Sequence, residues 1–321
     1  MRAAQVTRLD GPSAIEVRDV PEPEPGPYDV LVDVHRVGVS FPDLLLSRGE
    51  YQLKPDLPFT LGVDLAGTVV ADAHGFTAGQ RVAGVLAHGA AAERVAVPAA
   101  FTFPLPDDLS YDEGAALPMN YLTAQFALVE RGGLRDGETV LVHGAAGGVG
   151  TATLQVARGL GARTIGVVST EEKAAFARQA GADDVVLLDG FKDAVGGLTG
   201  GRGVDVVVDV VGGDAFTDSL RCLAGGGRLL VVGFAGGQGI PEVKVNRLLL
   251  NNIDVRGVGW GAWAMTRPTY MREQWKALGP LFASGAIRPP IGATYDLAGI
   301  GQALADMDAR RTLGKTVLRV R

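Results

Sequence analysis

The first 115 or so residues carry short apolar runs separated by turns rich in proline and glycine, such as the segment 21–27. Short runs of this kind, bounded by turn residues, are typical of β-strands. The pattern therefore predicts a compact, partly antiparallel β domain in this part of the chain. The expected strands are 14–20, 29–39, 66–71, 81–86 and 92–97.

The pattern changes near Ser110, where strands and helices begin to alternate. Glu113 follows Ser110 at the spacing of a capping box that opens a helix, and a second helix is expected at 121–131. Several later strands are continuous apolar runs, as in parallel strands covered by helices on both faces. The predicted strands are 139–143, 164–168, 185–188, 204–208, 228–232 and 254–258, and the predicted helices are 148–160, 171–180 and 214–223.

This alternation predicts an α/β fold with a doubly wound parallel sheet of the Rossmann type. A helix at 268–284 and a strand at 316–320 follow the last of these strands. The tail is too short to bury a core of its own, so we expect it to return to the N-terminal domain. The predicted organisation is a β-rich domain made of 1–122 and 264–321, and a Rossmann domain made of 123–263.

The turn between the strand 139–143 and the helix 148–160 is rich in glycine. Glycines let the backbone turn sharply and let a pyrophosphate approach without meeting a Cβ atom. The helix N-terminus adds N–H groups and a partial positive charge. An ordinary strand-to-helix turn is the alternative, but the position between a strand and a helix gives the motif weight. The residues expected to bind a dinucleotide here are Gly144, Ala146, Gly147, Gly148, Val149 and Gly150.

The end of the strand 164–168 bears on which dinucleotide binds. An NAD site usually has Asp or Glu at this strand tip to bind the ribose 2′-hydroxyl, whereas Ser169 and Thr170 follow the strand here. A small hydroxyl side chain leaves room for a 2′-phosphate, and Lys173 is placed to balance its charge. The sequence therefore favours NADPH as the cofactor. If the strand runs further, Glu171 is the alternative ribose ligand.

Composition narrows the classes of function. The chain has 321 residues and a formal net charge of −6. Without a Lys/Arg run, this acidity gives no reason to expect nucleic-acid binding and argues weakly against an anionic membrane surface. No apolar stretch approaches the roughly 20 residues that span a bilayer. The single cysteine, Cys222, and the lack of a signal peptide favour the cytoplasm.

The sequence gives no indication of a metal site or of covalent catalysis. The four histidines and Cys222 show no spacing typical of metal ligands, so no metal is expected. We expect Cys222 to pack on the helix 214–223. No Gly-x-Ser-x-Gly elbow or Cys/His arrangement indicates covalent catalysis.

Motifs along essentially the whole chain resemble the medium-chain dehydrogenase/reductase superfamily, and in particular its zinc-independent NADPH:quinone oxidoreductase branch. The resemblance implies a GroES-like catalytic domain beside the Rossmann domain, and a homodimer joined at the edge strand 254–258. It is carried by Val39-Ser40-Phe41-Pro42-Asp43, Tyr51, the run 57–67, Asn120-Tyr121-Leu122-Thr123-Ala124, the glycine turn 144–150, Asp209-Val210-Val211-Gly212-Gly213, Gly233-Phe234-Ala235 and Gly314-Lys315-Thr316-Val317.

The resemblance also implies that catalytic zinc is absent. In zinc-dependent members a Cys-His-x-Asp stretch stands in the place of Ser40-Phe41-Pro42-Asp43, and Gly-His-Glu stands in the place of Gly62-Val63-Asp64. The cysteine and histidine ligands are therefore replaced here. The branch usually has Asn in place of Ser40, so we expect Ser40 to make a weaker or water-mediated contact with the nicotinamide or the substrate.

The implied reaction is direct hydride transfer from NADPH to a quinone or a similar electron-poor acceptor. Tyr51 is the expected hydrogen-bond donor to the acceptor, with packing on the β domain as the alternative. Asp43 is expected to orient its neighbours, and Ser40 completes the catalytic set. Further residues expected to contact the cofactor are Asn120, Thr123, Val211, Gly233, Phe234, Ala235 and Lys315; helix capping by Asn120 and Thr123 and a solvated Lys315 are the alternatives.

Two other functions remain open at this point. One is NADPH-dependent reduction of an enoyl-CoA, acryloyl-CoA or alkenal double bond; a CoA substrate would favour basic residues such as Arg48, Lys54, Arg267 or Arg272 near its entrance. The other is a non-catalytic NADPH-binding protein. In each case the expected partner is a small molecule, with neither nucleic acid nor membrane.

Overall fold

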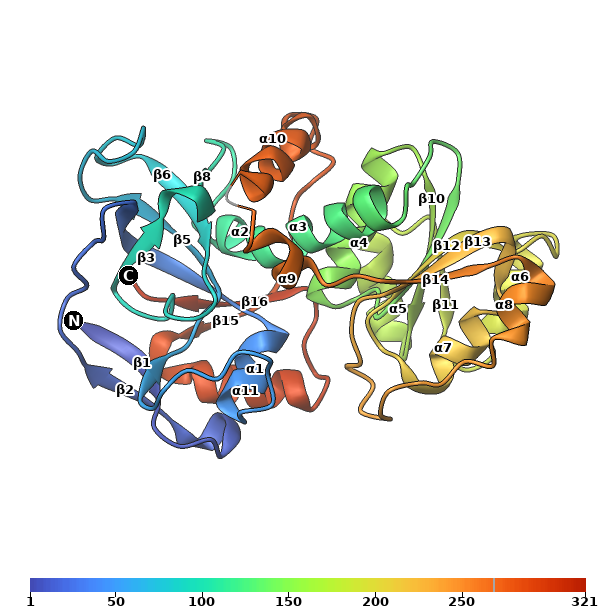
Figure 1. Cartoon of the computed structure of the whole chain (residues 1–321), viewed down its shortest axis with the longest axis horizontal. Helices are drawn as coiled ribbons and strands as arrows, with labels where there is room; N and C mark the ends of the chain where they lie inside the picture. The colour runs from blue at the N-terminus through green and yellow to red at the C-terminus, as the bar shows by residue number, and fades with distance from the viewer. Residues whose placement is uncertain (268) are drawn as a thin grey trace. The chain divides into compact units, whose positions relative to one another are not determined.

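The computed structural model describes residues 1–267 and 269–321, and its contacts divide the chain into two compact units (Figure 1). Unit 1 comprises Met1–Met119, Pro268–Lys276 and Pro289–Arg321, and unit 2 comprises Asn120–Arg267 and Ala277–Arg288. The boundaries of the two units differ from the domain boundaries predicted from the sequence mainly because Ala277–Arg288 belongs to unit 2. Gln155 holds this segment there, since its side chain donates to Arg288 O at 2.9 Å and accepts from Arg288 N at 3.0 Å.

Unit 2 contains a six-stranded parallel sheet with the order β11-β10-β9-β12-β13-β14. The strand order reverses between β9 and β12, which is the topological switch point at which open α/β sheets bind ligands. All six strands were predicted, and β14 is an edge strand as expected. Their bounds are Thr139–His143 (β9), Arg163–Val168 (β10), Asp184–Leu187 (β11), Val204–Asp209 (β12), Leu223–Val231 (β13) and Asp254–Gly257 (β14).

Helices cover both faces of this sheet. Crossovers between parallel strands are right-handed. Helices α4 and α5 therefore lie on one face of the sheet, and α6, α7 and α8 lie on the other. The second face contains a buried cluster that includes Leu141, Val207 and Phe216. The bounds are Pro118–Gln125 (α3), continued by a π-helical turn at Phe126–Arg131, Gly148–Gly159 (α4), Glu171–Gln179 (α5), Phe191–Leu198 (α6), Gly213–Ser219 (α7), Asn246–Asn251 (α8), Trp260–Ala264 (α9) and Tyr270–Ala283 (α10).

The prediction of a helix at 214–223 was too long. Helix α7 ends at Ser219 because the chain must turn there to begin β13 at Leu223. Cys222 therefore lies in the turn rather than on the helix, where its carbonyl oxygen accepts from Val204 N at 2.8 Å. Burial raises the pKa of its thiol to about 12, in keeping with a packing role.

Unit 1 is β-rich. Its larger sheet has the order β15-β16-β3-β5-β6-β8, with β7 also paired to β3, and its smaller sheet has the order β2-β1-β4. Strand β16 pairs antiparallel with β3, with Thr316 opposite Val39, which confirms that the tail returns to the N-terminal domain. The strands are Arg2–Val6 (β1), Ile15–Asp19 (β2), Asp29–Val39 (β3), Phe59–Thr60 (β4), Asp64–Val69 (β5), Arg81–Val85 (β6), Arg94–Pro98 (β7), Thr102–Pro104 (β8), Ile291–Asp296 (β15) and Lys315–Arg319 (β16), and the α-helices are Phe41–Ser47 (α1), Tyr111–Ala116 (α2) and Ile300–Asp308 (α11).

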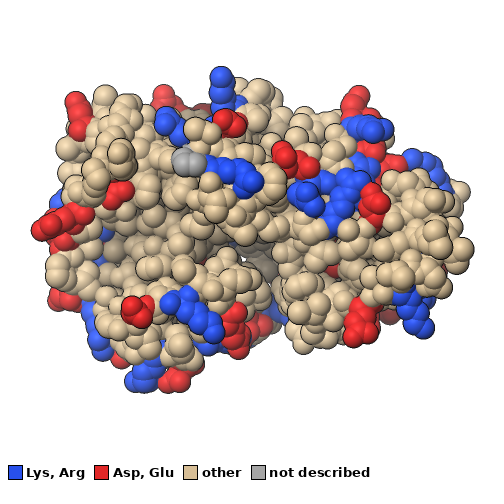
Figure 2. Space-filling view, viewed as in Figure 1, with Lys and Arg blue, Asp and Glu red and all other residues tan. Residues whose placement is uncertain are grey.

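Two features of the described structure concern its charge distribution and its helices. On the face shown in Figure 2, acidic and basic side chains are interspersed rather than gathered by sign. Among the described residues, no helix is both long and apolar enough to cross a membrane.

Candidate active site

The glycine turn of unit 2 opens helix α4 without a side-chain cap. Gly147 is the N-cap residue, and it provides no side-chain oxygen for the N–H groups of the first turn. The turn closes on itself, since Gly147 N donates to Gly144 O at 2.9 Å. The helix therefore presents backbone donors and the positive end of its dipole at the carboxyl edge of the sheet, which suits an anionic ligand.

At three glycines of this turn a Cβ atom would collide with neighbouring protein atoms. Gly144 has φ +60°, and a Cβ there would lie 2.9 Å from Val210 Cγ2. A Cβ on Gly150 would lie 2.1 Å from Gly144 O, and one on Gly148 would lie 2.5 Å from Nδ2 of Asn120. The turn is thus fixed in a narrow conformation, and the residues fit a phosphate-binding cradle.

The loops after β12 and β13 meet beside the glycine turn. Asp209 Oδ1 accepts from Val211 N at 2.8 Å, which fixes the first loop. The second loop is tied to the first because Ala235 N donates to Val210 O at 3.0 Å. Phe234 is 40% exposed. The structure therefore brings together the predicted cofactor residues Gly144, Val211, Gly233, Phe234 and Ala235 at one edge of the sheet.

Strand β10 ends at Val168, so Ser169 and Thr170 follow its tip, as the sequence predicted. Thr170 is the N-cap of α5 and accepts from Lys173 N at 3.3 Å. Lys173 Nζ donates to Ser169 Oγ at 3.3 Å. Glu171 is the first residue of α5, not the end of the strand. The strand tip therefore carries a hydroxyl and an ammonium group within hydrogen-bonding distance of each other.

Asn120 and Thr123 lie on α3 and are buried, with exposed fractions of 5% and 7%. The side-chain amide of Asn120 lies against Gly148, at the start of α4. The adjacent Tyr121 donates its hydroxyl to Gln155 Oε1 on α4 at 2.7 Å. Asn120 is thus held at the mouth of the cradle by the packing of α3 on α4.

Unit 1 contains a buried polar cluster formed by Ser40, Asp43, Asp64 and Lys315, which we call the lysine cluster. Lys315 Nζ donates to Asp64 Oδ2 at 2.5 Å and to Ser40 Oγ at 2.6 Å. The Ser40 hydroxyl in turn donates to Asp64 Oδ2 at 3.0 Å. Lys315 is 3% exposed and Asp64 is fully buried. Lys315, expected to contact the cofactor, has its ammonium group held by Ser40 and Asp64 in the structure.

Backbone geometry fixes the lysine cluster. Lys315 opens β16, which pairs with β3 so that its stem passes over Gly38, where a Cβ would lie 2.6 Å from Lys315 Cε. Asp43 accepts from Ser40 N at 2.9 Å and from Gly62 N at 3.0 Å. It thus ties the start of α1 to the segment that leads into β5, and this holds Ser40 in place. Asp43 is therefore a positioning residue in this geometry.

Burial dominates the electrostatics of the two carboxyl groups. It raises the pKa of Asp43 to about 7, although the two N–H donors and the charge of Lys315 act in the opposite direction. Burial also raises the pKa of Asp64 above its usual value, opposed by Lys315 and by hydrogen bonds from Met119 N and Ser40. The Lys315 ammonium compensates the Asp64 carboxylate directly.

Tyr51 lies near this cluster and is half-buried against the unit 1 core. Desolvation raises the pKa of its hydroxyl, and the negative charge of Asp43 adds to the effect. The phenol is thus neutral at physiological pH. In the described part of the chain no hydrogen-bond acceptor is recorded for its hydroxyl, so Tyr51 keeps a donor available for a ligand.

Sequence reasoning missed the central role of Asp64. The local signal was a lone acid in an apolar run, with a lysine at the start of the C-terminal strand. Asp209 and His143 are fully buried at the ends of β12 and β9, and no role had been predicted for either. Charged or polar residues in otherwise apolar strands are the general signal, because burial of such groups requires a partner.

The residues of the lysine cluster do not fit a zinc site. Its groups are a hydroxyl, carboxylates and an ammonium, whereas zinc in proteins prefers thiolate, imidazole and carboxylate ligands. A search of the described residues finds no group of three or more His, Cys, Asp or Glu side chains arranged to hold a metal. The ammonium of Lys315 lies between Ser40 and Asp64, where the cation of a metal site would be expected.

Comparisons with known proteins extend this picture. Residues 26–107 match the family model described as the alcohol dehydrogenase GroES-like domain, and residues 148–283 match the one described as zinc-binding dehydrogenase. The chain is 38% identical to quinone oxidoreductase-like protein 2 of Bos taurus, over 100% of this chain and 93% of that protein.

Solved structures that match over the whole chain include the following two. A probable oxidoreductase from Mycobacterium abscessus has a TM-score of 0.91 and 44% identity, over 100% of this chain and 99% of that one. The quinone oxidoreductase of Thermus thermophilus, also solved in complex with NADPH, has a TM-score of 0.86 and 35% identity over 100% of both chains. The fold expectation, a Rossmann domain and a GroES-like domain, is confirmed. The chain is therefore a member of the quinone oxidoreductase family of the medium-chain dehydrogenase/reductase superfamily.

Proposed function

We propose that this oxidoreductase is a zinc-independent reductase that uses NADPH to reduce a quinone or a similar electron-poor acceptor. The observation that carries the proposal is the uncapped start of α4 at the switch point of the sheet, with glycines where any Cβ would collide. When bound, NADPH supplies a hydride from C4 of its nicotinamide. The residues of this chain bind, orient and polarise the reactants.

The start of α4 is proposed to hold the pyrophosphate through its free N–H groups. The pair formed by Ser169 and Lys173 would then bind the 2′-phosphate, with a hydroxyl donor and a compensating charge. The residues directly after β10 are Ser169 and Thr170, and the nearest carboxylate along the chain is that of Glu171 in α5. The residues 211 and 233–235 would line the nicotinamide, because they lie at the same edge of the sheet.

The lysine cluster is proposed to act on the acceptor. Reduction of a quinone or an activated alkene places negative charge on an oxygen, which hydrogen-bond donors stabilise. Tyr51 offers a hydroxyl for this purpose. Lys315 contributes a positive charge that Asp64 partly compensates, and Ser40 accepts from Lys315 while donating to Asp64. Asp43 acts through Ser40, since it holds the backbone of that residue.

A CoA thioester is a weaker candidate for the acceptor. Of the four basic residues considered for it, Arg48 pairs with Asp308 at 2.6 Å and Arg267 stacks over the ring of Trp263 at 3.8 Å. Two of the cations are thus engaged within the protein. The names of the relatives, which refer to quinone reduction, also favour a quinone.

The test is a steady-state assay of NADPH and NADH oxidation against quinones, enals and enoyl-CoA thioesters. We expect NADPH to be preferred and a quinone to give the highest kcat/KM. If enals or thioesters were preferred, the proposed acceptor would be wrong, but the proposed cofactor would stand. Tight NADPH binding without turnover of any acceptor would support a non-catalytic protein and contradict the proposal.

We also propose a cytoplasmic homodimer. In the described structure, strand β14 has one neighbouring strand, β13. Its other edge is therefore free to pair with a second copy of the chain. A single cysteine fits a reducing compartment. Light scattering on the purified protein checks the dimer, and a mass of about one chain would contradict it.

A further inference from the structure

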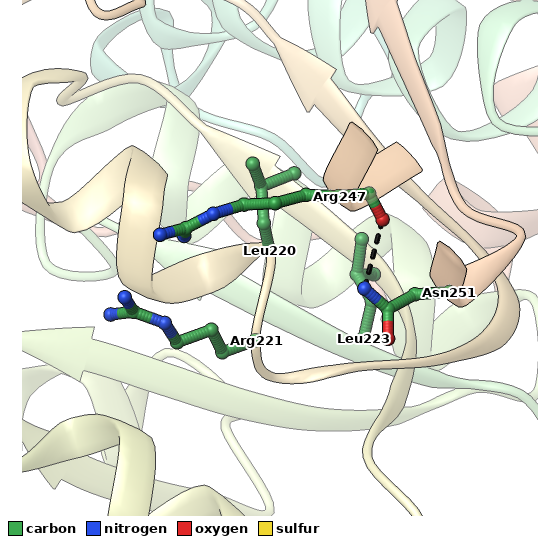
Figure 3. Close-up of a pocket in the computed structure, with 5 residues that line it drawn as sticks. All are labelled: Leu220, Arg221, Leu223, Arg247 and Asn251. Carbon is green, nitrogen blue, oxygen red and sulfur yellow. Dashed lines mark hydrogen bonds between the residues drawn. The ribbon is translucent and has the colours of Figure 1, made fainter. Parts of the chain in front are cut away.

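A cavity in unit 2 lies at the edge of the sheet opposite the glycine turn. Its volume is about 410 Å³, and it is lined by Leu220, Arg221, Leu223, Arg247 and Asn251 (Figure 3). The segment 220–223 connects α7 to the start of β13, whereas the glycine turn follows the end of β9. Leu223 and Val231 of β13 lie opposite Val204 and Asp209, the two ends of β12, so the two edges are roughly 17 Å apart. The cavity is therefore separate from the proposed cofactor site.

Arg247 brings an unsatisfied donor to this cavity. Its Nη1 atom is buried and has no hydrogen-bond partner among the described residues. The backbone of Arg247 is held in place, because Asn251 Nδ2 donates to its carbonyl oxygen at 2.8 Å and so ties the ends of α8 together. A buried guanidinium N–H without an acceptor costs free energy, which an oxyanion at this position would recover.

Arg221 supplies a second guanidinium group. In Figure 3 the guanidinium groups of Arg221 and Arg247 point to the same side of the cavity. Asp218 pairs with Arg221, so two arginines and one aspartate leave a formal charge of 2 − 1 = +1 here. Leu220 and Leu223 add an apolar wall. The combination matches an anionic head group attached to a small apolar body.

We propose that this cavity binds a small organic anion through a phosphoryl or carboxylate group held by Arg247 and Arg221. Arginine forks bind both groups with two parallel hydrogen bonds, and they do so more strongly than neutral donors. The site lies outside the proposed reaction centre, so its ligand is distinct from NADPH and from the acceptor.

The experiment titrates the full chain with sodium phosphate in one arm and sodium succinate in the other. Sodium chloride keeps the ionic strength constant, and saturating NADPH keeps phosphate away from the glycine turn. Calorimetry measures the dissociation constant. We expect saturable binding in at least one arm, and the arm that binds identifies the head group.

Three variants assign the binding to the cavity. Arg247→Met should weaken it at least tenfold, and the more exposed Arg221→Gln should weaken it as well. Arg178→Gln removes the same charge from an exposed position on α5 and should leave the dissociation constant unchanged. Binding that survives Arg247→Met and Arg221→Gln, or no saturable binding in either arm, overturns the proposal. If NADPH itself fails to bind, the titration without it still tests the cavity, because the arginine variants report on this site alone.

Discussion

Lys315 Nζ and Asp64 Oδ2 lie 2.5 Å apart in the interior of unit 1, although 251 residues separate them in the chain. Both side chains are buried. Ser40 and Asp64 stand where the zinc-dependent relatives are expected to carry a cysteine and a glutamate. A protein cation therefore lies between Ser40 and Asp64, and its charge disfavours binding of a divalent ion there.

The first prediction concerns the loss of this cation. Lys315→Met keeps most of the stem but leaves the Asp64 carboxylate buried and unpaired. We expect the free energy of unfolding to fall by about 3–5 kcal/mol, as for other broken buried pairs. Denaturant unfolding measures it.

The double variant Lys315→Met/Asp64→Asn is the control, since it removes both charges together. It should recover a large part of the lost stability. If the double variant is no more stable than Lys315→Met, the unpaired carboxylate is not the cause of the loss.

The sheet of unit 2 could be predicted because its strands are apolar runs bounded by turn residues. Helix α6 could not, because Gly196 and Gly197 lie within it and glycine disfavours helix. The glycine turn and the tip of β10 could also be predicted, because each is recognised from a few consecutive residues. The lysine cluster depends on the pairing of β16 with β3, and no local pattern reveals which acid a distant lysine will meet.

The second prediction concerns the phosphate cradle. Gly150→Ala places a Cβ 2.1 Å from Gly144 O, so the turn must open. We expect NADPH to bind at least tenfold more weakly, measured by calorimetry. Gly196→Ala on α6 is the matched control, because no atom lies within 4 Å of its Cβ. Equal binding by Gly150→Ala and the wild type would remove the cradle from the cofactor site.

The third prediction concerns cofactor choice. Ser169→Asp places a carboxylate at the tip of β10, where it repels a 2′-phosphate. We expect kcat/KM for NADPH to fall at least tenfold, or about 1.4 kcal/mol, while kcat/KM for NADH stays the same or rises.

Lys173→Gln should lower kcat/KM for NADPH alone, since only NADPH carries the 2′-phosphate. Lys276→Gln, an exposed lysine on α10, serves as its control. If kcat/KM fell equally for NADPH and NADH in both Ser169→Asp and Lys173→Gln, this strand tip would not recognise the 2′-phosphate.

The fourth prediction concerns His143. Ser219 Oγ donates its one proton to Ala215 O at 2.6 Å, so Nε2 of His143 must donate to Ser219 Oγ, also at 2.6 Å. Burial lowers the pKa of His143 below 6.5, opposed by the nearby Asp209, so the imidazole is neutral at pH 7. The unfolded chain binds a proton first as the pH falls, so stability drops as pH decreases below about 6.5.

Thermal unfolding measured between pH 7.5 and pH 5.5 tests whether the stability of the protein falls as the pH decreases. His143→Gln removes the titrating group, so its midpoint should depend less steeply on pH than that of the wild type, whatever its absolute stability. An unchanged slope would mean that His143 does not contribute to acid sensitivity.

The central claim, hydride transfer from NADPH without a metal, is tested most directly by one anaerobic measurement. Protein treated with a chelator and shown to be free of zinc is mixed with NADPH and a quinone, and consumption of both is followed. The account predicts that one NADPH is oxidised for each quinone reduced to the hydroquinone, at the rate of the untreated protein. Loss of turnover on zinc removal, with recovery on zinc addition, would contradict it.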